Sequence, residues 1–401
     1  MFRLFSDNLN IPFLQGRRFF SGLSIAMCAL SVFFVMDRGL NFGVDFAGGV
    51  QMVLNFPEEA EVTADQVRSG LSDFGISQAT VQNFGTEFDQ RPSEYIISFP
   101  ADIFEEEGMA NAIFSILQEE IGLSEAGLRE FRLSGFERAF VVIETDEGLD
   151  RLRGILVGQS LGPIRILDVL SFGSMEAQQY EISFSSLPAE IVQYFQRELV
   201  GENADARVVV EKVDFVGARV GQDLKTAALL SIFVTILLVF IYIFLRFDLM
   251  YAPGVVVALG HDVLITVGLF ALTGFEFDLA VVAALLTVAG YSINDTIVVY
   301  DRIRESIGQY KGKSLIDILN IAINQTMNRT VITSATTLMA TVVLWVVGGP
   351  VIHSFAFALC VGILVGTYSS IFVAAPLVYW MNLWLSKRGA GVNQKKKAAV
   401  A

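Results

Sequence analysis

The twenty residues Thr226–Leu245, TAALLSIFVTILLVFIYIFL, decide the class of fold, because they include no charged side chain. A helix of about 20 apolar residues is long enough to cross the ~30 Å hydrocarbon core of a bilayer. The run therefore predicts a transmembrane helix. The composition of the chain agrees: 53% of its 401 residues are hydrophobic and 17% are charged, whereas a soluble domain is typically about 25% charged.

Further apolar runs flank this segment on both sides. They are Phe19–Met36, Tyr251–Leu272, Leu279–Tyr300, Val331–Val347 and Phe355–Trp380. The first run follows two arginines and has the position of a secretory signal peptide. It is long for such a signal and ends in bulky residues rather than a small-x-small cleavage site, so we expect an uncleaved anchor. The sequence thus predicts six crossings: 19–36, and five more within 226–384.

The lysines and arginines outside the segment 37–225 fall on one side of a six-crossing arrangement. They are Arg3, Arg17, Arg18, Arg246, Arg302, Arg304, Lys311, Lys313, Arg329, Lys387, Arg388 and Lys395–Lys397. Those from Arg302 to Arg329 are interpreted as a loop between the fourth and fifth crossings. Loops 273–278 and 348–354 contain no Lys or Arg. Since positive loops stay in the cytoplasm, we expect residues 1–18 and the basic tail 385–401 to be cytoplasmic and 37–225 to be extracytoplasmic.

The extracytoplasmic segment 37–225 is acidic, with 33 acidic and 14 basic residues, and the rest of the chain carries a net charge of +5. An acidic domain argues against nucleic acid as a partner, because phosphates bind basic surfaces. The segment contains no cysteine, so disulfides cannot stabilise it.

Short strand-like and helix-like patterns alternate along this segment. Strands are expected at Val50–Phe56, Thr80–Phe84, Tyr95–Phe99, Ala139–Ile143, Ile164–Val169, Tyr180–Phe184 and Arg207–Val213, and helices at Thr63–Phe74, Ile103–Leu117, Gly148–Val157 and Pro188–Leu199. The order is close to two copies of β-α-β-β-α-β, the ferredoxin-like unit. We therefore expect two α+β lobes, 41–122 and an added or inserted lobe 124–213. A single irregular α+β domain is the alternative.

Several classes of chemistry are not indicated. Two cysteines and two histidines leave no zinc site. The sequence contains no Walker loop and no nucleophile elbow. We therefore expect no metal, no cofactor and no enzymatic activity.

Ionisable residues inside the crossings are the candidate functional residues, because such groups are costly in a bilayer. The third crossing carries His261 and Asp262, and Asp262 lies about 16 Å along the helix from its start at ~1.5 Å per residue. The fourth carries Asn294 and Asp295. The fifth is entered near Arg329, so Arg329 and Asp295 can reach a similar depth on different helices.

Two interpretations of these residues remain open. In one they form a proton relay, in which a carboxyl group gains and loses its proton as its distance from a guanidinium changes. In the other they hold helices together: Asp295 and Arg329 as a fixed ion pair, and His261–Asp262 as a satisfied polar contact. Arg329 can also simply extend to the membrane surface. The hydroxyl residues 333–337 either pack helices or line a hydrated path.

Four stretches of the sequence resemble the SecF family, the smaller membrane subunit of the bacterial SecD–SecF protein-export complex. They are Asn41–Gly49 (NFGVDFAGG), Val213–Gly221 (VDFVGARVG), the His261–Asp262 dipeptide and Gly290–Glu305 (GYSINDTIVVYDRIRE), followed by Asn328–Thr330. The fourth-crossing stretch is long and specific. The resemblance covers all six crossings and both ends of the outer domain.

The resemblance implies half of an RND-type transporter, with SecD as the other half and the SecY–SecE–SecG channel as the larger partner in the bacterial inner membrane. It implies that the proton-motive force helps a translocating preprotein outward at a late stage. Asp295 and Arg329 match residues that the family uses for proton conduction. Asp45, Gly48 and Gly49 match its motif after the first crossing, although they can instead form only a tight turn.

The outer domain is longer than the common family form, which points to an insertion from about 124 to 203. The alternatives to protein export are half of an RND-like proton-coupled exporter of small molecules, and a scaffold for the channel that moves no protons.

Overall fold

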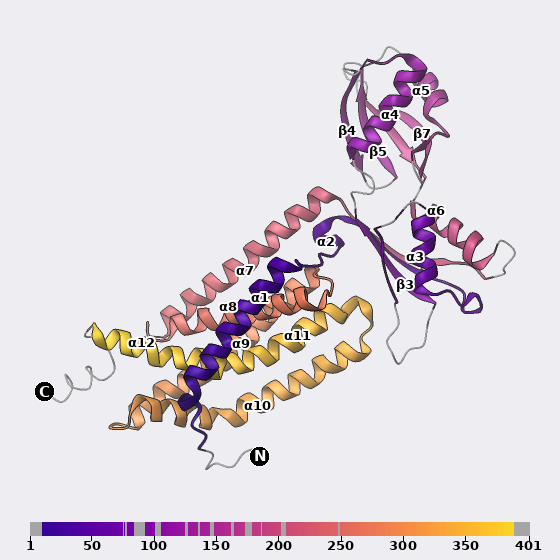
Figure 1. Ribbon diagram of the computed structural model, residues 1–401. Coiled ribbons are helices and arrows are strands. Elements are labelled where there is room, and N and C mark those ends of the chain that lie inside the picture. The colour runs from indigo at the N-terminus through magenta and orange to yellow at the C-terminus, as the bar shows by residue number, and fades with distance from the viewer. Residues whose placement is uncertain are drawn as a thin grey trace. The chain divides into compact units, whose positions relative to one another are not determined.

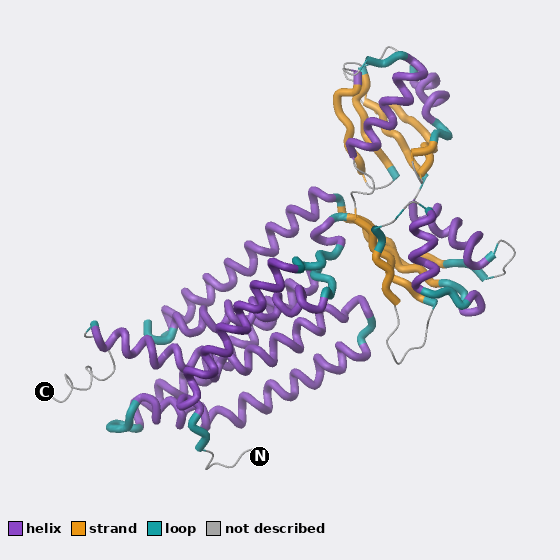
Figure 2. The backbone as a smooth tube through the Cα atoms, viewed as in Figure 1, coloured by secondary structure: helices purple, strands orange, loops and turns teal. Residues whose placement is uncertain are grey.

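The computed structural model describes residues 10–74, 76, 78–83, 93–100, 106–124, 127–134, 137–144, 148–161, 164–172, 179–185, 187–201, 206–247 and 249–388. Arg3 and most of the predicted basic tail, including Lys395–Lys397, lie outside these residues. The chain forms two compact units: a helical one from residues 1–42 and 226–401, and an α+β one from residues 43–225. Figure 2 shows that the strands are confined to the second unit.

The helical unit confirms the six predicted crossings. A 3₁₀ turn η1 (Phe13–Gly16) leads into α1 (Arg17–Asp37), and the remaining long helices are α7 (Ala218–Arg246), α8 (Ala252–Thr273), α9 (Leu279–Gln309), α10 (Leu315–Val347), α11 (Pro350–Ser369) and α12 (Ala375–Lys387). Six stretches of these helices are long and apolar enough to cross a membrane, and the last combines α11 and α12. Figure 1 shows them running roughly side by side.

The region Arg302–Arg329 is mostly helical, so the prediction that it is a loop is wrong. Helix α9 continues to Gln309, and α10 already begins at Leu315. Ser314 caps α10 by accepting a hydrogen bond from the backbone N–H of Asp317, as expected of an N-cap serine. Residues at helical spacing are buried along the first turns of α10 and hold it in place: Ile318, Leu319, Ala322 and Ile323.

Residues near the start of the chain are hydrogen-bonded to the first turns of α10. The Asn324 side chain exchanges hydrogen bonds with the backbone of Ile11, at 2.9 and 2.8 Å. Asn320 accepts one from the N–H of Leu14 at 2.9 Å. These amide contacts satisfy backbone groups that the short 3₁₀ turn leaves unpaired.

Helices α8, α9 and α11 form the interior of the unit. About half or more of the residues in their most apolar stretches are buried, against 11% for α1 and α7 and 17% for α10. Helices α9 and α11 approach closely at Gly362, where an added Cβ would lie 2.4 Å from the Val288 side chain. Gly362 is therefore a small residue in a helix interface, as small-xxx-small packing requires.

The sixth crossing is not one regular helix. A π-helical turn η6 (Ser370–Ala374) separates α11 from α12, and Pro376 follows it. The Ala374 carbonyl accepts a hydrogen bond from the hydroxyl of the fully buried Tyr300, at 3.2 Å. Turns of this kind are frequent at functional sites.

The α+β unit contains two sheets. Its strands are β1 (Gly49–Asn55), β2 (Thr80–Asn83), β3 (Glu94–Pro100), β4 (Leu128–Ser134), β5 (Arg138–Ile143), β6 (Ser160–Leu161), β7 (Ile164–Phe172), β8 (Gln179–Phe184) and β9 (Val209–Val216), and its helices of more than one turn are α3 (Ala64–Asp73), α4 (Glu106–Ile121), α5 (Leu149–Leu156) and α6 (Leu187–Phe195). The sheets have the orders β2-β3-β1-β9 and β4-β5-β8-β7-β6. Two lobes are therefore present.

The lobe boundaries differ from those predicted. Strand β9 pairs with β1, with Gly49 opposite Val216, and α6 packs with α3 and β9. Helix α4 instead packs beside α5 and β4. The first lobe is thus β1-α3-β2-β3 completed by α6-β9, and the second is α4-β4 together with β5-α5-β6-β7-β8. The prediction of consecutive lobes 41–122 and 124–213 is wrong, because the last helix and strand of each repeat join the other sheet.

A short connection accounts for this exchange. Strand β4 ends at Ser134 and β5 begins at Arg138, and these two residues are partners in an antiparallel pair. A connection this short favours antiparallel pairing of β4 with β5 over pairing with any more distant strand. The place beside β1 then remains open, and β9 fills it. The first lobe keeps the ferredoxin-like sheet order, although its second helix lies far along the chain.

The motif after the first crossing forms a tight turn. A four-residue helix α2 (Val44–Ala47) ends at Gly48, whose φ is 73° and ψ 154°, a conformation that is essentially restricted to glycine. Gly49 also has a positive φ, of 143°. An added Cβ at Gly221, in the motif at the other end of the domain, would lie 3.0 Å from the backbone of Phe46 and Gly48. The two sequence motifs are therefore packed together within the α+β unit.

The exchange makes a prediction about excision. Removing residues 101–186, with a short glycine–serine linker from Pro100 to Leu187, should leave a first lobe that folds, because β1, β2, β3, β9, α3 and α6 all remain. Removing 124–203 should unfold it, because α6 is lost. Limited proteolysis of the two purified outer domains distinguishes these results, and equal protease resistance would contradict the assignment.

Candidate functional site

Asp262 lies at the centre of a buried polar cluster. Its side chain on α8 is 0% exposed. One carboxylate oxygen lies 2.9 Å from Nδ1 of His261. The other accepts hydrogen bonds from Ser292 of α9 at 2.6 Å and Ser369 of α11 at 2.8 Å. The predicted His261–Asp262 dipeptide therefore faces the interior of the helical unit, and Asp262 links α8 to α9 and α11.

Asp295 forms a second cluster. It is 3% exposed on α9, and its carboxylate accepts a hydrogen bond from the Ser334 hydroxyl of α10 at 3.3 Å. The Thr367 hydroxyl of α11 donates to Ser334 at 2.7 Å. The protonation state of Asp295 is thereby connected to the packing of α9, α10 and α11.

Arg329 lies near Asp295 without closing on it. Its charge is close enough to act on the carboxylate. The two side chains, both among the described residues, form no salt bridge within 4.0 Å. Arg329 is exposed at the surface of the unit. The arrangement is an open pair rather than the fixed ion pair that was the alternative interpretation.

Asn294 and the threonines of α10 lie apart from the carboxylates. Asn294 is exposed, on the side of α9 away from Asp295. Thr333, Thr336 and Thr337 donate to backbone carbonyls of their own helix at about 3 Å, a common arrangement for hydroxyls in apolar helices. Ser334 is thus the member of this group that reaches a carboxylate.

Of the hydroxyl residues around the two carboxylates, Ser334 was among the candidates 333–337, whereas Ser292, Thr367 and Ser369 were not predicted. Thr367 and Ser369 belong to a short polar stretch in the sixth crossing, Thr367–Ser370. Such a stretch in an otherwise apolar helix was a usable signal. Ser292 was visible only as a neighbour of Asn294 and Asp295, and its contact with Asp262 depends on how α8 and α9 are rotated.

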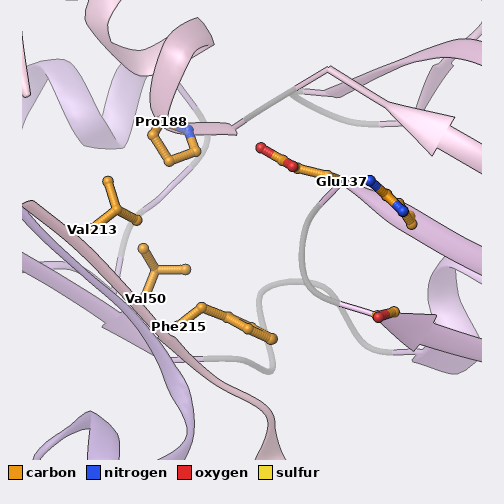
Figure 3. A pocket seen from close by; sticks show the side chains of 7 residues that line it. Val50, Glu137, Pro188, Val213 and Phe215 are labelled. Atoms are coloured by element: carbon orange, nitrogen blue, oxygen red, sulfur yellow. The ribbon is translucent and has the colours of Figure 1, made fainter.

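A pocket of about 390 Å³ lies within the α+β unit. Figure 3 shows Val50, Val213 and Phe215 along one side of it and Glu137 across from them. Val213 and Phe215 are each 42% exposed on β9, which is an edge strand of the first sheet. The pocket thus combines an apolar wall with a charged one.

Comparison with known proteins finds two matching families along this chain. Residues 196–384 match the C-terminal family of SecD/SecF protein export membrane proteins, and residues 33–56, which contain Gly48 and Gly49, match the SecD/SecF GG motif. Protein translocase subunit SecF of Desulfurispirillum indicum is 33% identical over 97% of this chain and 98% of its own length. The subunit of the same name from Vibrio alginolyticus is 33% identical, over 94% and 91% respectively.

A solved structure supports the fold as well. The crystal structure of SecDF from Thermus thermophilus, a translocon-associated membrane protein, matches 94% of this chain with a TM-score of 0.64 and 27% identity. This chain spans 40% of that protein. The match confirms six membrane helices with an α+β domain between the first and second. On the near full-length identity to SecF subunits and the two family matches, this chain belongs to the SecF family of protein translocase subunits.

Proposed function

We propose that this chain acts with SecD as a proton-driven subunit of the protein-export machinery and promotes a late stage of translocation across the inner membrane. The observation that carries the proposal is the open pair of Asp295 and Arg329. A buried carboxylate that is not closed on a cation can change protonation state at a moderate cost, whereas a closed buried pair resists separation.

The energy available to such a site is sufficient. One proton that moves down ~100 mV releases about 2.3 kcal/mol, which biases a conformational equilibrium about fifty-fold. Asp295 is hydrogen-bonded to α10 through Ser334, and from there to α11 through Thr367. Loss or gain of its proton therefore acts directly on the contact among three helices.

The surface of α9 supports SecD as the partner. Thr287, Gly290 and Asn294 are exposed at helical spacing on one side of α9, and Thr336 is exposed on α10. Small and polar residues are typical of helix–helix contacts in membranes rather than of lipid-facing surfaces. We assign this side of α9 to the contact with the helices of SecD.

The location follows from the charges. The arginines and lysines near the helix ends would lie in the cytoplasm if both termini are cytoplasmic, as positive loops require. The acidic α+β unit would then be extracytoplasmic, where a translocating preprotein emerges. The exposed apolar edge of β9, with Val213 and Phe215, is a suitable surface for an extended preprotein segment. The SecY–SecE–SecG channel would supply that segment.

Inverted membrane vesicles test the proposal. Export of a secreted protein should be compared with and without an uncoupler, in vesicles that contain or lack this chain. A coupling subunit contributes only to the gradient-dependent part of the rate, so the uncoupler should have no further effect once the chain is removed. A scaffold would lower the rate by the same factor in both conditions, and this result would overturn the proposal.

A further inference from the structure

The His261–Asp262 cluster is a second ionisable site that the open pair does not use. Within the described residues, the Asp262 side chain contacts His261, Ser292 and Ser369. None of these hydroxyls carries a charge, and the base in contact with the carboxylate is His261. If the imidazole were neutral and the carboxylate ionised, a net negative charge would be buried in the middle of the helices, which is strongly unfavourable.

The two side chains are therefore expected to hold one proton between them. Whether this proton makes an imidazolium beside a carboxylate or a carboxylic acid beside an imidazole, Nδ1 is occupied by the contact with Asp262. Nε2 of His261 then carries an N–H. That nitrogen is buried and has no hydrogen-bond partner in the part of the chain that the structure describes. It is the atom at which the proton of the cluster can leave or arrive.

The groups around the dyad leave it separate from the Asp295 cluster. The His261 ring stacks on Tyr368 of α11, with ring centroids 6.0 Å apart and planes at 21°. Cys28 of α1 interacts electrostatically with Asp262. On α9, Tyr291 precedes Ser292, and its buried hydroxyl has no hydrogen-bond partner among the described residues. Asp295 lies three residues beyond Ser292, and its carboxylate accepts its hydrogen bond from Ser334 of α10. The carboxylate of Asp262 therefore contacts α9 and α11, whereas that of Asp295 contacts α10.

Helix α11 is contacted by both clusters through neighbouring residues. Thr367 belongs to the Asp295 network and Ser369 to the Asp262 network. The π-helical turn η6 begins at the next residue, Ser370. A change in the charge of either carboxylate therefore acts on α11 just before its irregular turn.

We infer that His261 and Asp262 form a second proton-binding site, which gains and loses its proton at Nε2 of His261. Its protonation state changes the strength of the hydrogen bond from Ser369 to Asp262. This rests on the proposed proton coupling. On release, the Nε2–H bond breaks and the proton passes to water, which leaves a neutral imidazole with Nδ1–H donating to an ionised Asp262. The carboxylate then carries a negative charge that no neighbouring cation balances. The hydroxyls of Ser292 and Ser369 bind it more strongly, because hydrogen bonds to a charged acceptor are stronger, and they offset part of the cost of burying that charge.

The test uses the full chain in complex with SecD, in inverted vesicles, with Asp262→Asn, Asp295→Asn and the control Thr266→Val. Thr266 is equally buried one turn along α8, and its hydroxyl donates to the backbone carbonyl of Asp262, not to the carboxylate. Asp262→Asn should lower gradient-dependent export by up to about fifty-fold, the bias that one proton supplies at ~100 mV, and should flatten its pH profile. Thr266→Val should keep the wild-type profile.

Infrared difference spectra of the purified complex between acidic and neutral pH give a readout that a purely structural role would not change. A band of the protonated pair, either the carboxylic-acid C=O band of Asp262 or the imidazolium ring band of His261, should disappear in Asp262→Asn and remain in Asp295→Asn. An unchanged pH profile together with an unchanged spectrum would overturn the inference. If only Asp295→Asn loses gradient dependence, the second site fails and the proposed function stands. If neither variant loses it, the proposed function itself fails.

Asp262→Asn can fail to assemble, and His261→Gln then decides the question. It keeps the carboxylate and a donor beside it but removes the buried Nε2 nitrogen. Export with the wild-type pH profile in His261→Gln would also overturn the inference.

Discussion

Replacing Asp295 with asparagine is expected to remove the gradient-dependent part of protein export, a loss of about fifty-fold at ~100 mV. Asparagine has the same shape, and its carbonyl can still accept the hydrogen bond from Ser334, which lies 3.3 Å from the carboxylate. It cannot gain or lose a proton. The helices should therefore still pack, and export without a gradient should keep its wild-type rate.

The measurement is export into inverted vesicles with and without an uncoupler. Asp301→Asn is the matched control, because Asp301 is an exposed carboxylate further along the same helix. It removes the same charge without touching the Ser334–Thr367 network. Export by Asp295→Asn that still falls on addition of uncoupler, as far as the wild type does, would show that Asp295 does not carry the proton.

Introducing a methyl group at Gly254 is expected to destabilise the interior of the helical unit strongly. An added Cβ would lie 2.2 Å from the Tyr300 hydroxyl and 3.2 Å from the Ala374 carbonyl. Both groups belong to the hydrogen bond that accompanies the π-helical turn. Overpacking of a rigid core typically costs about 1–3 kcal/mol, and here the displaced hydroxyl loses its buried partner as well, at about 1–3 kcal/mol more.

The double variant Gly254→Ala/Tyr300→Phe should recover part of this loss, because the colliding oxygen is gone. Tyr300→Phe alone should be mildly destabilising, since it leaves the Ala374 carbonyl without that donor. Gly260→Ala on the same helix is the control: nothing lies within 4 Å of its added Cβ, and alanine favours a helix over glycine by about 1 kcal/mol. Thermal unfolding of the purified proteins in detergent measures all four. Strictly additive losses would show that Gly254 and Tyr300 do not collide.

The crossings could be predicted from composition because the bilayer imposes one simple requirement, an apolar length. The ends of the helices could not be, since Arg302 to Arg329 is polar enough to resemble a loop. A usable cue was present in that stretch: Ile318, Leu319, Ala322 and Ile323 recur at helical spacing behind the capping residue Ser314. This periodicity is a stronger signal for a helix than the charge content of the stretch is for a loop.

The outer domain shows a different limit. The repeated β-α-β-β-α-β order was visible in the sequence, but strand β4 was not, because most of Leu128–Ser134 is exposed or half-buried and does not alternate cleanly. Even with β4 known, the sequence leaves two choices, because either β4 or β9 can pair with β1 and the other with β5. Strand partners of similar composition are distinguished by the connecting loop rather than by the strands themselves.

The ionisable residues of the candidate site could be predicted from the sequence, but their contacts could not. Polarity in an apolar helix identified Asp262, Asp295 and Arg329. Which hydroxyl meets which carboxylate depends on helix rotation, and a single helix pattern does not determine it. The side that Asn294 faces was likewise undetermined, although its separation from Asp295 by one residue places the two side chains about 100° apart around the helix.

The pairing of Gly49 with Val216 has a consequence for how the protein is made. The central strand of the first sheet is among the earliest parts of the domain to be synthesised, and its neighbour β9 is the last before α7. Pairing over so long a stretch of chain is slow, and the apolar strands β1 and β3 stay incomplete while the entire second lobe is being produced. A newly made subunit of the export machinery therefore passes through an interval in which its α+β unit is only partly folded. The unit is most open to proteases and aggregation until translation reaches the second crossing.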